Sequence, residues 1–338
     1  MNWIPSSFLR LAVLCWLCSF ALFAQGPLIP PGPPLPTMKA LDQIEPRIPV
    51  ESLPAGGSAR YQITQPGSYY LSSNLTAAAG QNGISIATSN VTLDLNGFTM
   101  FGVTNRIALL NSISAANGIR VLKGRMANWL HCVSFSSASN VVLEDLELRC
   151  APGGSSRFGI RSGLRSVVRR CLVSDADGSG SAGIYLSDDS VIESSIVLNS
   201  NQGILVEDGC RIEGCTVRSC NGQGIQGLNG CLVRNSTTER CDGGIRVAAN
   251  SMVADNLALF CPGSGFYAAG SYSRIERNAA HFNIIGFQTV SGSTNFVVQN
   301  VAHGNTNSNY TLLGTEVSGP TVTTVGIVTN HPWANFSF

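Results

Sequence analysis

The stretch Ile212-Glu-Gly-Cys215-Thr-Val217-Arg-Ser-Cys220-Asn-Gly-Gln-Gly224-Ile225 is one unit of a repeat that determines the fold. Its closing pair, Gly followed by Ile or Phe, occurs six times at spacings of 20, 21, 20, 21 and 21 residues. The six pairs are Gly183-Ile184, Gly203-Ile204, Gly224-Ile225, Gly244-Ile245, Gly265-Phe266 and Gly286-Phe287. A period of this length means one supersecondary unit per repeat, and neighbouring units must stack to bury a continuous core.

Strands and turns make up the unit. Short apolar runs alternate with Gly, Asn, Ser and Cys, and no apolar series has the i, i+3, i+4, i+7 spacing of a helix. Two or three short strands with tight turns fit one lap of a parallel β-helix at roughly 3.3 Å per strand residue. A leucine-rich horseshoe, the main competitor, would show Leu-x-x-Leu-x-Leu, which this repeat lacks. We therefore expect an all-β chain, a single-stranded parallel β-helix with about 21 residues per coil.

Small polar residues form three columns in step with the repeat. Each column sits at a fixed distance from the apolar anchors Ile192, Ile212, Val233, Val253, Ile275 and Val297. Residues of one column in adjacent coils should lie about 4.8 Å apart, so that an Asn amide can bond the Asn of the next coil at each corner. The residues that we assign to these structural ladders are Cys215, Cys220, Cys241, Cys261, Asn256, Asn278, Asn283, Asn300 and Asn305.

The opening strands extend this pattern towards the N-terminus. They are Gly67-Ser-Tyr-Tyr-Leu-Ser-Ser-Asn-Leu-Thr76, Asn82-Gly-Ile-Ser-Ile86 and Asn90-Val-Thr-Leu-Asp-Leu-Asn-Gly-Phe98. With the Gly-Ile starts and the polar columns, the chain resembles the right-handed parallel β-helix repeat proteins of the pectate-lyase-like superfamily, from about Tyr61 to Tyr310. The resemblance implies a right-handed coil. Relatives include polysaccharide lyases, hydrolases, epimerases, sugar-binding modules and exported proteins of no known activity, so the fold alone does not give the function.

Composition divides the chain into four segments. Residues 1–24 have Arg10, an apolar run and Ala24, which is typical of a secretory signal peptide. Residues 25–60 are expected to form a proline-rich spacer and N-terminal cap, 61–310 the β-helix, and 311–338 C-terminal strands or a cap. We expect a secreted, periplasmic or cell-surface protein with no membrane span in the mature chain.

The early coils are less regular than the later ones. Gly83-Ile84, Gly118-Ile119 and Gly159-Ile160 are the expected coil starts, and residues 106–116 and 150–158 are the expected protruding loops. Insertions in solenoids often carry binding residues, which makes Trp129 and His131 candidates in this region. A corner or core position is the commoner role for a large aromatic such as Trp129.

The charge content bears on the expected partner, and the cysteine content bears on disulfide bonding. Charged residues are 12% of the chain and the net charge is +1, so we expect no nucleic-acid partner. Nine cysteines remain after the signal peptide, most of them in the polar columns. Stacked parallel side chains give a poor disulfide torsion, which favours reduced, buried thiols, but one or more bridges stay open as the alternative. No cofactor is expected, apart from a possible Ca²⁺ ion.

Carboxylates in register supply the candidates for catalysis and metal binding. Asp188 and Asp208 occupy equivalent positions, with Asp189 and Glu207 beside them, and could bind Ca²⁺ or act as an acid and base pair on a glycosidic bond. Glu193, Glu213 and Arg169 are further catalytic candidates. Because Arg169 and Arg234 flank the two glutamates one coil either way, a row of outward salt bridges is the favoured interpretation.

Three further patterns resemble catalytic motifs without completing them. Asp175-Ala-Asp-Gly178 resembles the Asn-Thr-Asp-Gly of polygalacturonase-like hydrolases, and Asp188-Asp189 resembles their paired aspartates, but no Arg-Ile-Lys follows. His281 and His303 share one column, with no carboxylate at that coil position, and are candidates for binding. A pectate-lyase pattern would need one arginine base, and no feature selects one from Arg161, Arg165, Arg169 and Arg170.

Two functions from different classes follow. The first is an exported solenoid without a complete catalytic set, which binds glycan or serves as a cell-surface or extracellular structural component. The second is a carbohydrate-active enzyme, a polysaccharide lyase or glycoside hydrolase, acting on an acidic or plant or algal polysaccharide. The sequence favours the first, with polysaccharide as the expected partner.

Overall fold

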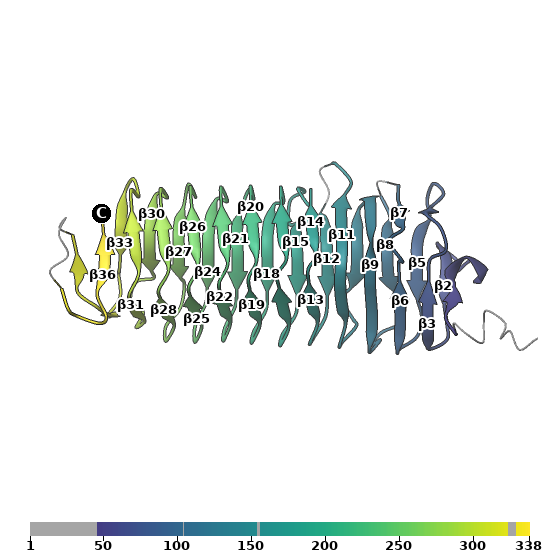
Figure 1. The fold of residues 1–338 in the computed structure, drawn as a ribbon, viewed down its shortest axis with the longest axis horizontal. Coiled ribbons are helices and arrows are strands. Elements are labelled where there is room, and N and C mark those ends of the chain that lie inside the picture. The colour runs from purple at the N-terminus through teal and green to yellow at the C-terminus, as the bar shows by residue number, and fades with distance from the viewer. Residues whose placement is uncertain (1–45, 104, 154–155, 324–328) are drawn as a thin grey trace, which may run out of the picture. The chain divides into compact units, whose positions relative to one another are not determined.

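The computed structural model describes residues 46–338 except 104, 154–155 and 324–328. The predicted signal peptide and residues 25–45 of the predicted spacer lie outside the described residues. Residues Arg47–Phe338 form one compact unit, and apart from one short 3-10 turn its described regular elements are all β-strands (Figure 1). A short 3-10 turn, η2 (Val50–Ser52), lies near its start. In the described part, no helix is long and apolar enough to cross a membrane.

The strands form two parallel sheets, one of 12 strands and one of 24, which we call sheet B and sheet A. Sheet B contains β2 (Ala59–Ile63), β5 (Asn82–Ile86), β8 (Ile107–Asn111), β10 (His131–Phe135), β12 (Phe158–Ser162), β15 (Ala182–Leu186), β18 (Gln202–Val206), β21 (Gln223–Gly227), β24 (Gly243–Val247), β27 (Ser264–Ala268), β30 (Ile285–Thr289) and β33 (Ser308–Thr311). Sheet B has one strand per coil, so the solenoid has about 12 coils of about 22 residues.

Sheet A receives the rest of each coil. Its strands are β1 (Ile48–Pro49), β3 (Gly67–Tyr70), β4 (Leu75–Thr76), β6 (Val91–Asp94), β7 (Thr99–Phe101), β9 (Ile119–Trp129), β11 (Val142–Cys150), β13 (Val167–Arg169), β14 (Leu172–Ser174), β16 (Val191–Glu193), β17 (Ile196–Leu198), β19 (Arg211–Glu213), β20 (Thr216–Arg218), β22 (Leu232–Arg234), β23 (Thr237–Glu239), β25 (Met252–Ala254), β26 (Leu257–Leu259), β28 (Arg274–Glu276), β29 (Ala279–His281), β31 (Phe296–Val298), β32 (Val301–His303), β34 (Val317–Ser318), β35 (Thr321–Val322) and β36 (Asn335–Ser337). Most coils thus hold one sheet-B strand and two short sheet-A strands.

Each regular coil bends at three corners. In the coil that starts with β15, the first, second and third corners have Asp189, Ser194 and Asn199 in the left-handed backbone conformation, with φ of 56°, 49° and 51°. At every corner the next residue is a buried small polar one, here Ser190, Ser195 or Ser200, each 1% exposed. The three predicted columns are these buried corner positions. Ser, Asn and Cys fit there because the corner leaves little room and exposes backbone groups that need partners.

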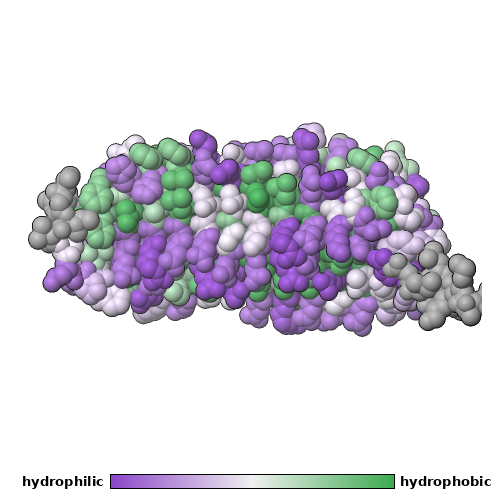
Figure 2. All heavy atoms as spheres, viewed as in Figure 1, coloured by the Kyte–Doolittle hydropathy of each residue, from purple (hydrophilic) through white to green (hydrophobic). Residues whose placement is uncertain are grey.

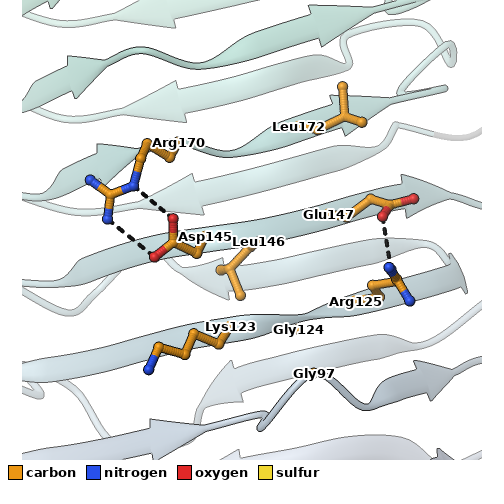
Figure 3. A pocket seen from close by; sticks show the side chains of 9 residues that line it. All are labelled: Gly97, Lys123, Gly124, Arg125, Asp145, Leu146, Glu147, Arg170 and Leu172. Carbon is orange, nitrogen blue, oxygen red and sulfur yellow. Dashed lines mark hydrogen bonds and ion pairs between the residues drawn. The ribbon is translucent and has the colours of Figure 1, made fainter.

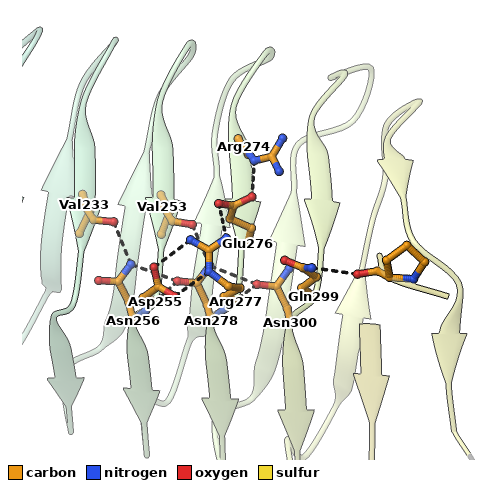
Figure 4. Close-up of polar contacts among 11 residues, drawn as sticks. Val233, Val253, Asp255, Asn256, Arg274, Glu276, Arg277, Asn278, Gln299 and Asn300 are labelled. Atoms are coloured by element: carbon orange, nitrogen blue, oxygen red, sulfur yellow. Dashed lines mark hydrogen bonds and ion pairs between the residues drawn. The ribbon is translucent and has the colours of Figure 1, made fainter. Parts of the chain in front are cut away.

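From Asn256 onward the second-corner column is an asparagine ladder (Figure 4). The Asn256 side-chain amide donates to Oδ1 of Asn278 at 3.0 Å, and the Asn278 amide donates to Oδ1 of Asn300 at 3.1 Å. Each Oδ1 also accepts the backbone N–H of the preceding asparagine, and Asn335 of β36 continues the ladder beyond Asn300. The ladder therefore satisfies buried backbone groups from coil to coil, as the backbone of a solenoid corner requires.

The repeated glycine has a steric cause. It is the second residue of a sheet-B strand and faces inward, where a Cβ on Gly183 would lie 2.3 Å from Cγ1 of Val197 and one on Gly224 would lie 2.8 Å from Cγ2 of Thr238. The following Ile or Phe fills the core, and Phe266 and Phe287 stack with ring centroids 4.9 Å apart. Glycine thus allows sheet B and the second sheet-A strand to meet closely at the third corner.

The early coils correct two expectations. Gly118-Ile119 does not begin a sheet-B strand, because Ile119 is the first residue of the long sheet-A strand β9. Residues 106–116 are not simply a protruding loop either, since Ile107–Asn111 is sheet-B strand β8. The true sheet-B partners are Tyr61, Ile84, Leu109, Val133, Ile160 and Ile184, which are 23 to 27 residues apart. These coils are longer than 21 residues, and two of them contain the uninterrupted strands β9 and β11.

All nine described cysteines are buried and none forms a disulfide. Burial raises the pKa of the Cys215 thiol to about 11 and that of the Cys210 thiol to about 12. These two thiols are therefore protonated near neutral pH, and they pack as small apolar side chains.

Candidate functional site

A hollow of about 500 Å³ crosses four coils of sheet A at the second corner (Figure 3). Gly97 and Gly124 leave room where other corners carry side chains, and the corner residues Lys123, Asp145 and Arg170 have left-handed backbones. We call this hollow the charged groove. Its lining residues are Gly97, Lys123, Gly124, Arg125, Asp145, Leu146, Glu147, Arg170 and Leu172.

Both carboxylates of the charged groove are held by arginines. Arg170 donates to Asp145 through two nitrogens, at 2.7 and 3.1 Å, and Arg125 donates to Glu147 at 2.9 Å. The hydrogen bond from Arg170 lowers the pKa of Asp145 below its ordinary value. Asp145 is therefore ionised at neutral pH and cannot donate a proton to a glycosidic oxygen, which is what a glycosidase acid must do.

A second hollow, of about 390 Å³, lies at the third corner and contains the aspartates of the hydrolase-like motif. Asp175 pairs with Arg149 at 2.8 Å, and Asp177 lies 3.5 Å from the guanidinium of Arg157. Both motif carboxylates thus have arginine partners. The structure places them together in one hollow, a proximity that the sequence suggested only by resemblance.

The outward face of sheet B differs from that of sheet A in its charged residues. None of its twelve described strands contains Asp or Glu, whereas they contain Arg60, Arg161 and Arg246. The strands of sheet A contain eight acidic residues, Asp94, Glu144, Asp145, Glu147, Glu193, Glu213, Glu239 and Glu276. Because carboxylates are missing from its strands, the sheet-B face has positive charges without strand neighbours of the opposite sign.

Aromatic rings take the place of carboxylates beside these arginines. The Arg161 guanidinium carbon lies 5.1 Å from the Phe158 ring centroid and 5.6 Å from that of Tyr185. Arg246 lies 5.7 Å from the Tyr267 centroid. These are cation–π distances, and in the described part of the chain neither arginine has an ion pair.

Two further polar groups border the first of these stacks. The Tyr185 hydroxyl donates to Glu207, and burial, with Glu207 second, raises the pKa of Tyr185 to about 12. Nδ1 of His131 accepts the Phe158 backbone N–H at 3.1 Å, which leaves Nε2 to carry the proton. Burial, and then Arg161 and Arg157, lower the pKa of His131 to about 4, so the ring is neutral at physiological pH.

We name this surface the arginine–aromatic face. It offers guanidinium and imidazole donors, a carboxylate acceptor and aromatic rings, which are the groups that bind sugars through their hydroxyls and apolar faces. It is defined by His131, Phe158, Arg161, Tyr185, Glu207, Arg246 and Tyr267. Figure 2 shows one side of the solenoid, on which hydrophilic side chains lie in rows along the long axis with hydrophobic patches between them.

The four acidic residues named for a possible Ca²⁺ ion are not gathered into one ligand group. Oδ1 of Asp188 accepts the backbone N–H of Asp208 at 2.9 Å, and Oδ1 of Asp208 accepts that of Asn229 at 2.8 Å. These carboxylates form a first-corner ladder, Asp189 adopts the left-handed corner conformation, and Glu207 accepts from Tyr185. Within the described residues no group of three or more His, Cys, Asp or Glu side chains could hold a metal ion.

The candidates Glu193, Glu213 and Arg169 lie on the outer side of sheet A. Arg211 bridges Glu193 at 2.6 Å and Glu213 at 3.2 Å, and Arg234 pairs with Glu213 at 2.8 Å. Arg169 pairs with Glu144 of the preceding coil at 3.0 Å. These contacts form the row of outward salt bridges that the alternating charges predict.

The remaining candidates do not form one site. Trp129 is 0% exposed and donates its indole N–H to the Met100 carbonyl at 2.9 Å, so it fills the core, the role that the sequence favoured over a sugar platform. His281 and His303 are neighbours on sheet A, with ring centroids 6.1 Å apart, and burial, with His303 second, lowers the pKa of His281. Of Trp129, His131, His281 and His303, it is His131 that the structure places on the arginine–aromatic face.

Sequence reasoning missed Tyr185, Arg246 and Tyr267 and did not select Arg161. A signal was present, because each of these residues stands two positions after a repeat glycine. The outward row reads Arg161, Tyr185, Leu205, Gln226, Arg246, Tyr267 and Gln288. The sequence shows this row only once the glycine is known to face inward.

Comparison with known proteins gives a family and a fold. Residues 62–231 and 182–324 match the family described as right handed beta helix region. No similar sequence is found among curated proteins.

Solved structures with similar folds share few residues with this chain. The catalytic unit of a thermostable GH87 α-1,3-glucanase from Streptomyces thermodiastaticus strain HF3-3 is 11% identical, with a TM-score of 0.52 over 86% of this chain and 68% of that one. A double mutant of the tailspike protein of E. coli bacteriophage HK620 is also 11% identical, with a TM-score of 0.53 over 84% of this chain and 68% of that one. At such identities the likeness shows the fold alone.

Proposed function

The chain belongs to the right-handed β-helix family, and from that premise we propose that its solenoid binds a glycan through the arginine–aromatic face. We also propose that it does so outside the cytoplasm, since the first 24 residues have the pattern of a secretory signal. The observation that carries the proposal is the arrangement of Arg161 over Phe158 and Tyr185 on a sheet whose strands contain no carboxylate.

The chemistry of this face suits a sugar better than an apolar ligand. Half-buried rings offer apolar contact for the C–H faces of a pyranose, while Arg161, the His131 N–H and Glu207 offer hydrogen bonds to its hydroxyl groups. Tyr185 is held in place by Glu207, and the rings are held by Arg161. Side chains that are already ordered lose little entropy when the ligand binds.

The comparisons support the choice of ligand class. One solved structure of similar fold is named as an α-1,3-glucanase, an enzyme of glucan chains, and the other is a phage tailspike. Their low identity to this chain gives no residue of the site, so the site itself is argued from the contacts described above.

Binding without turnover is the function that the charges favour. A glycosidase needs one carboxylic acid that stays protonated and a second carboxylate about 5 Å away in a retaining enzyme or about 6.5 to 9.5 Å away in an inverting one. Both carboxylates of the charged groove, and Asp175 and Asp177 beside it, have arginine partners. A lyase or hydrolase is the alternative that the experiment must separate.

The test is retention of the purified chain on a panel of immobilised polysaccharides, with reducing ends and unsaturated products measured in parallel. We expect retention without products, and a loss of affinity of roughly fivefold for Tyr185→Ala, because the replaced ring supplies about 1 kcal/mol of contact. Tyr272→Ala is the matched control, since Tyr272 is an aromatic at the first corner and 75% exposed. Products would favour the enzyme, and equal retention of the Tyr185 and Tyr272 variants would place the glycan elsewhere.

A further inference from the structure

Arginines on the two sheets have opposite surroundings. Every arginine within a described strand of sheet A has a carboxylate partner, whereas none within a strand of sheet B has one. The paired arginines are Arg120, Arg125, Arg149, Arg169, Arg211, Arg218, Arg234 and Arg274. The protein therefore neutralises its strand arginines on one sheet and leaves them unneutralised on the other.

The two central sheet-B arginines occupy equivalent places. Arg161 is directly followed in the next coil by Tyr185, and Arg246 is directly followed by Tyr267. In both cases the guanidinium lies over the tyrosine ring, at 5.6 and 5.7 Å from its centroid. The face thus carries the same arginine–tyrosine pair twice in one outward row.

Their spacing follows from the coil. The row passes from Arg161 through Tyr185, Leu205 and Gln226 to Arg246, which is four coil steps. At about 4.8 Å per step the two guanidinium groups stand roughly 19 Å apart along the solenoid axis. A single sugar cannot contact both, but an extended chain that lies along the axis can.

Stacking also prepares each guanidinium for an anion. A ring beneath the guanidinium covers one face of its plane and leaves the N–H groups at its edge available. Those N–H groups match the two oxygens of a carboxylate or sulfate. With no acidic residue in the sheet-B strands, an anionic ligand meets no carboxylate of like charge along the row, and Glu207 lies at its border.

We propose that the arginine–aromatic face binds an acidic polysaccharide lying along the solenoid axis, with one anionic group on Arg161 and another on Arg246. This deepens the proposed function and rests on it, since the same face takes the ligand. The anionic groups are carboxylates or sulfates. The chain between them passes over Leu205 and Gln226.

The proposal predicts a dependence on chain length and salt. An oligosaccharide too short to span roughly 19 Å uses one arginine–tyrosine pair, while a longer one uses both and gains from effective concentration. Because the guanidinium of Arg161 is exposed, the interaction should weaken as ionic strength rises.

The experiment measures binding of the full chain to polygalacturonate, to its methyl ester and to a sulfated glycan. Polygalacturonate and its ester share a backbone, so their difference isolates the carboxylates. The variants are Arg161→Gln, Arg246→Gln and the double substitution. Arg218→Gln is the matched control, since Arg218 is an outward sheet-A arginine that is half-exposed and paired with Glu239 at 3.0 Å.

We expect each single sheet-B variant to bind an acidic polymer about tenfold more weakly, and the double variant to bind it no better than the neutral ester. The control should bind as the wild type does. Oligomers shorter than the span should be sensitive to one substitution only. Preference for polygalacturonate identifies the anion as carboxylate, and preference for the sulfated glycan identifies it as sulfate.

Other results would overturn the proposal in distinguishable ways. Equal binding of acid and ester, with the arginine variants unchanged but Tyr185→Ala still weakened, would remove the acidic specificity and leave the proposed function standing. Absence of binding to any glycan would remove both. An equal loss in Arg218→Gln would show attraction to charge in general rather than to this row. Melting curves that match the wild type show that Arg161→Gln is folded, as expected for a side chain without an ion pair.

Discussion

Sheet A and sheet B belong to the same coils, but their outward faces are built on different principles. On sheet A, arginines and carboxylates of adjacent coils pair in rows, as Arg211 does with Glu193 and Glu213. On sheet B, Arg161 and Arg246 lie on aromatic rings. Paired rows stabilise the stacking of one coil on the next and penalise a shifted register, whereas unpaired arginines contribute little to the fold. The difference separates residues that maintain the solenoid from residues that are available to a ligand.

The largest loss of stability should come from a substitution in the asparagine ladder that supports sheet A. Asn278→Leu removes the Oδ1 atom that accepts the Asn256 backbone N–H and the amide that donates to the Val253 carbonyl, and so takes these partners from two buried backbone groups. We expect a loss of about 3 kcal/mol in the free energy of unfolding, measured with urea by circular dichroism. Gln226→Leu, on the outward row of sheet B, should change it by less than about 0.5 kcal/mol. Similar losses in the two variants would contradict the assignment of the ladder.

A smaller effect is expected at the ion pairs of sheet A. Glu144 has a side chain that is 12% exposed and accepts from Arg120, Arg169 and Arg170. The hydrogen bond from Arg169, the largest cause, lowers its pKa from the ordinary 4.5 to about 2. The ionised form is thus favoured by folding, and its contribution is present above pH 4.5 and lost as the pH falls to about 2.

Glu144→Gln should therefore melt a few degrees below the wild type at pH 7 and match it near pH 2. Thermal melts across this range measure the gap. A gap that stays constant down to pH 2 would mean that the ion pairs are not its cause.

On sheet B, the dependence of stability on pH should come from a buried histidine rather than from ion pairs. The pKa of His131 is lowered from 6.5 to about 4, first by burial and then by Arg161 and Arg157, so the folded chain binds fewer protons than the unfolded chain between these values. Stability should fall as the pH drops from 6.5 to 4 and be flat above it. His131→Gln should reduce this slope to the smaller part that His281 contributes, while His303→Gln should leave the part due to His131. An unchanged slope in the first variant would contradict the buried, neutral histidine.

The smallest effect is expected at the third corner, where the two sheets meet. Phe282 is 48% exposed, has a left-handed backbone with φ of 57°, and stacks on Phe260 at 5.3 Å. Asn accepts this backbone more readily than Phe but cannot replace the ring contact. The two terms oppose each other, so Phe282→Asn should shift the unfolding free energy by less than about 1 kcal/mol. A much larger loss would show that the stacked pair supports the corner.

The regular coils could be predicted in detail because their features recur in register. The columns that contain Cys215, Asn256 and Asn278 became visible by counting from a core residue, and they lie at the corners. The early coils could not be predicted as well. Gly118 precedes an Ile as the repeat glycines do, but Ile119 begins a sheet-A strand, and only its register with Val91 shows this.

The candidate site was harder to predict, because the spacing of charged residues in the sequence does not show which groups they bond to. Asp188 and Asp208 are in register, as expected, yet their carboxylates accept backbone N–H groups of the next coil, which no residue pattern indicated. Arg161 and Arg170 were indistinguishable as residues. The structure separates them, because Asp145 partners Arg170 and rings partner Arg161.

Because each coil adds a fixed rise, residues in the outward row of sheet B are separated by whole multiples of that rise. Deleting residues 206–226 would join equivalent backbone positions. The distance between Arg161 and Arg246 would then fall from four coil steps to three, or from roughly 19 to roughly 14 Å. Adding a coil would lengthen it by the same unit. A chain of this kind can therefore be matched to ligands of different charge period by duplicating or losing entire coils, without any change in the side chains that make contact.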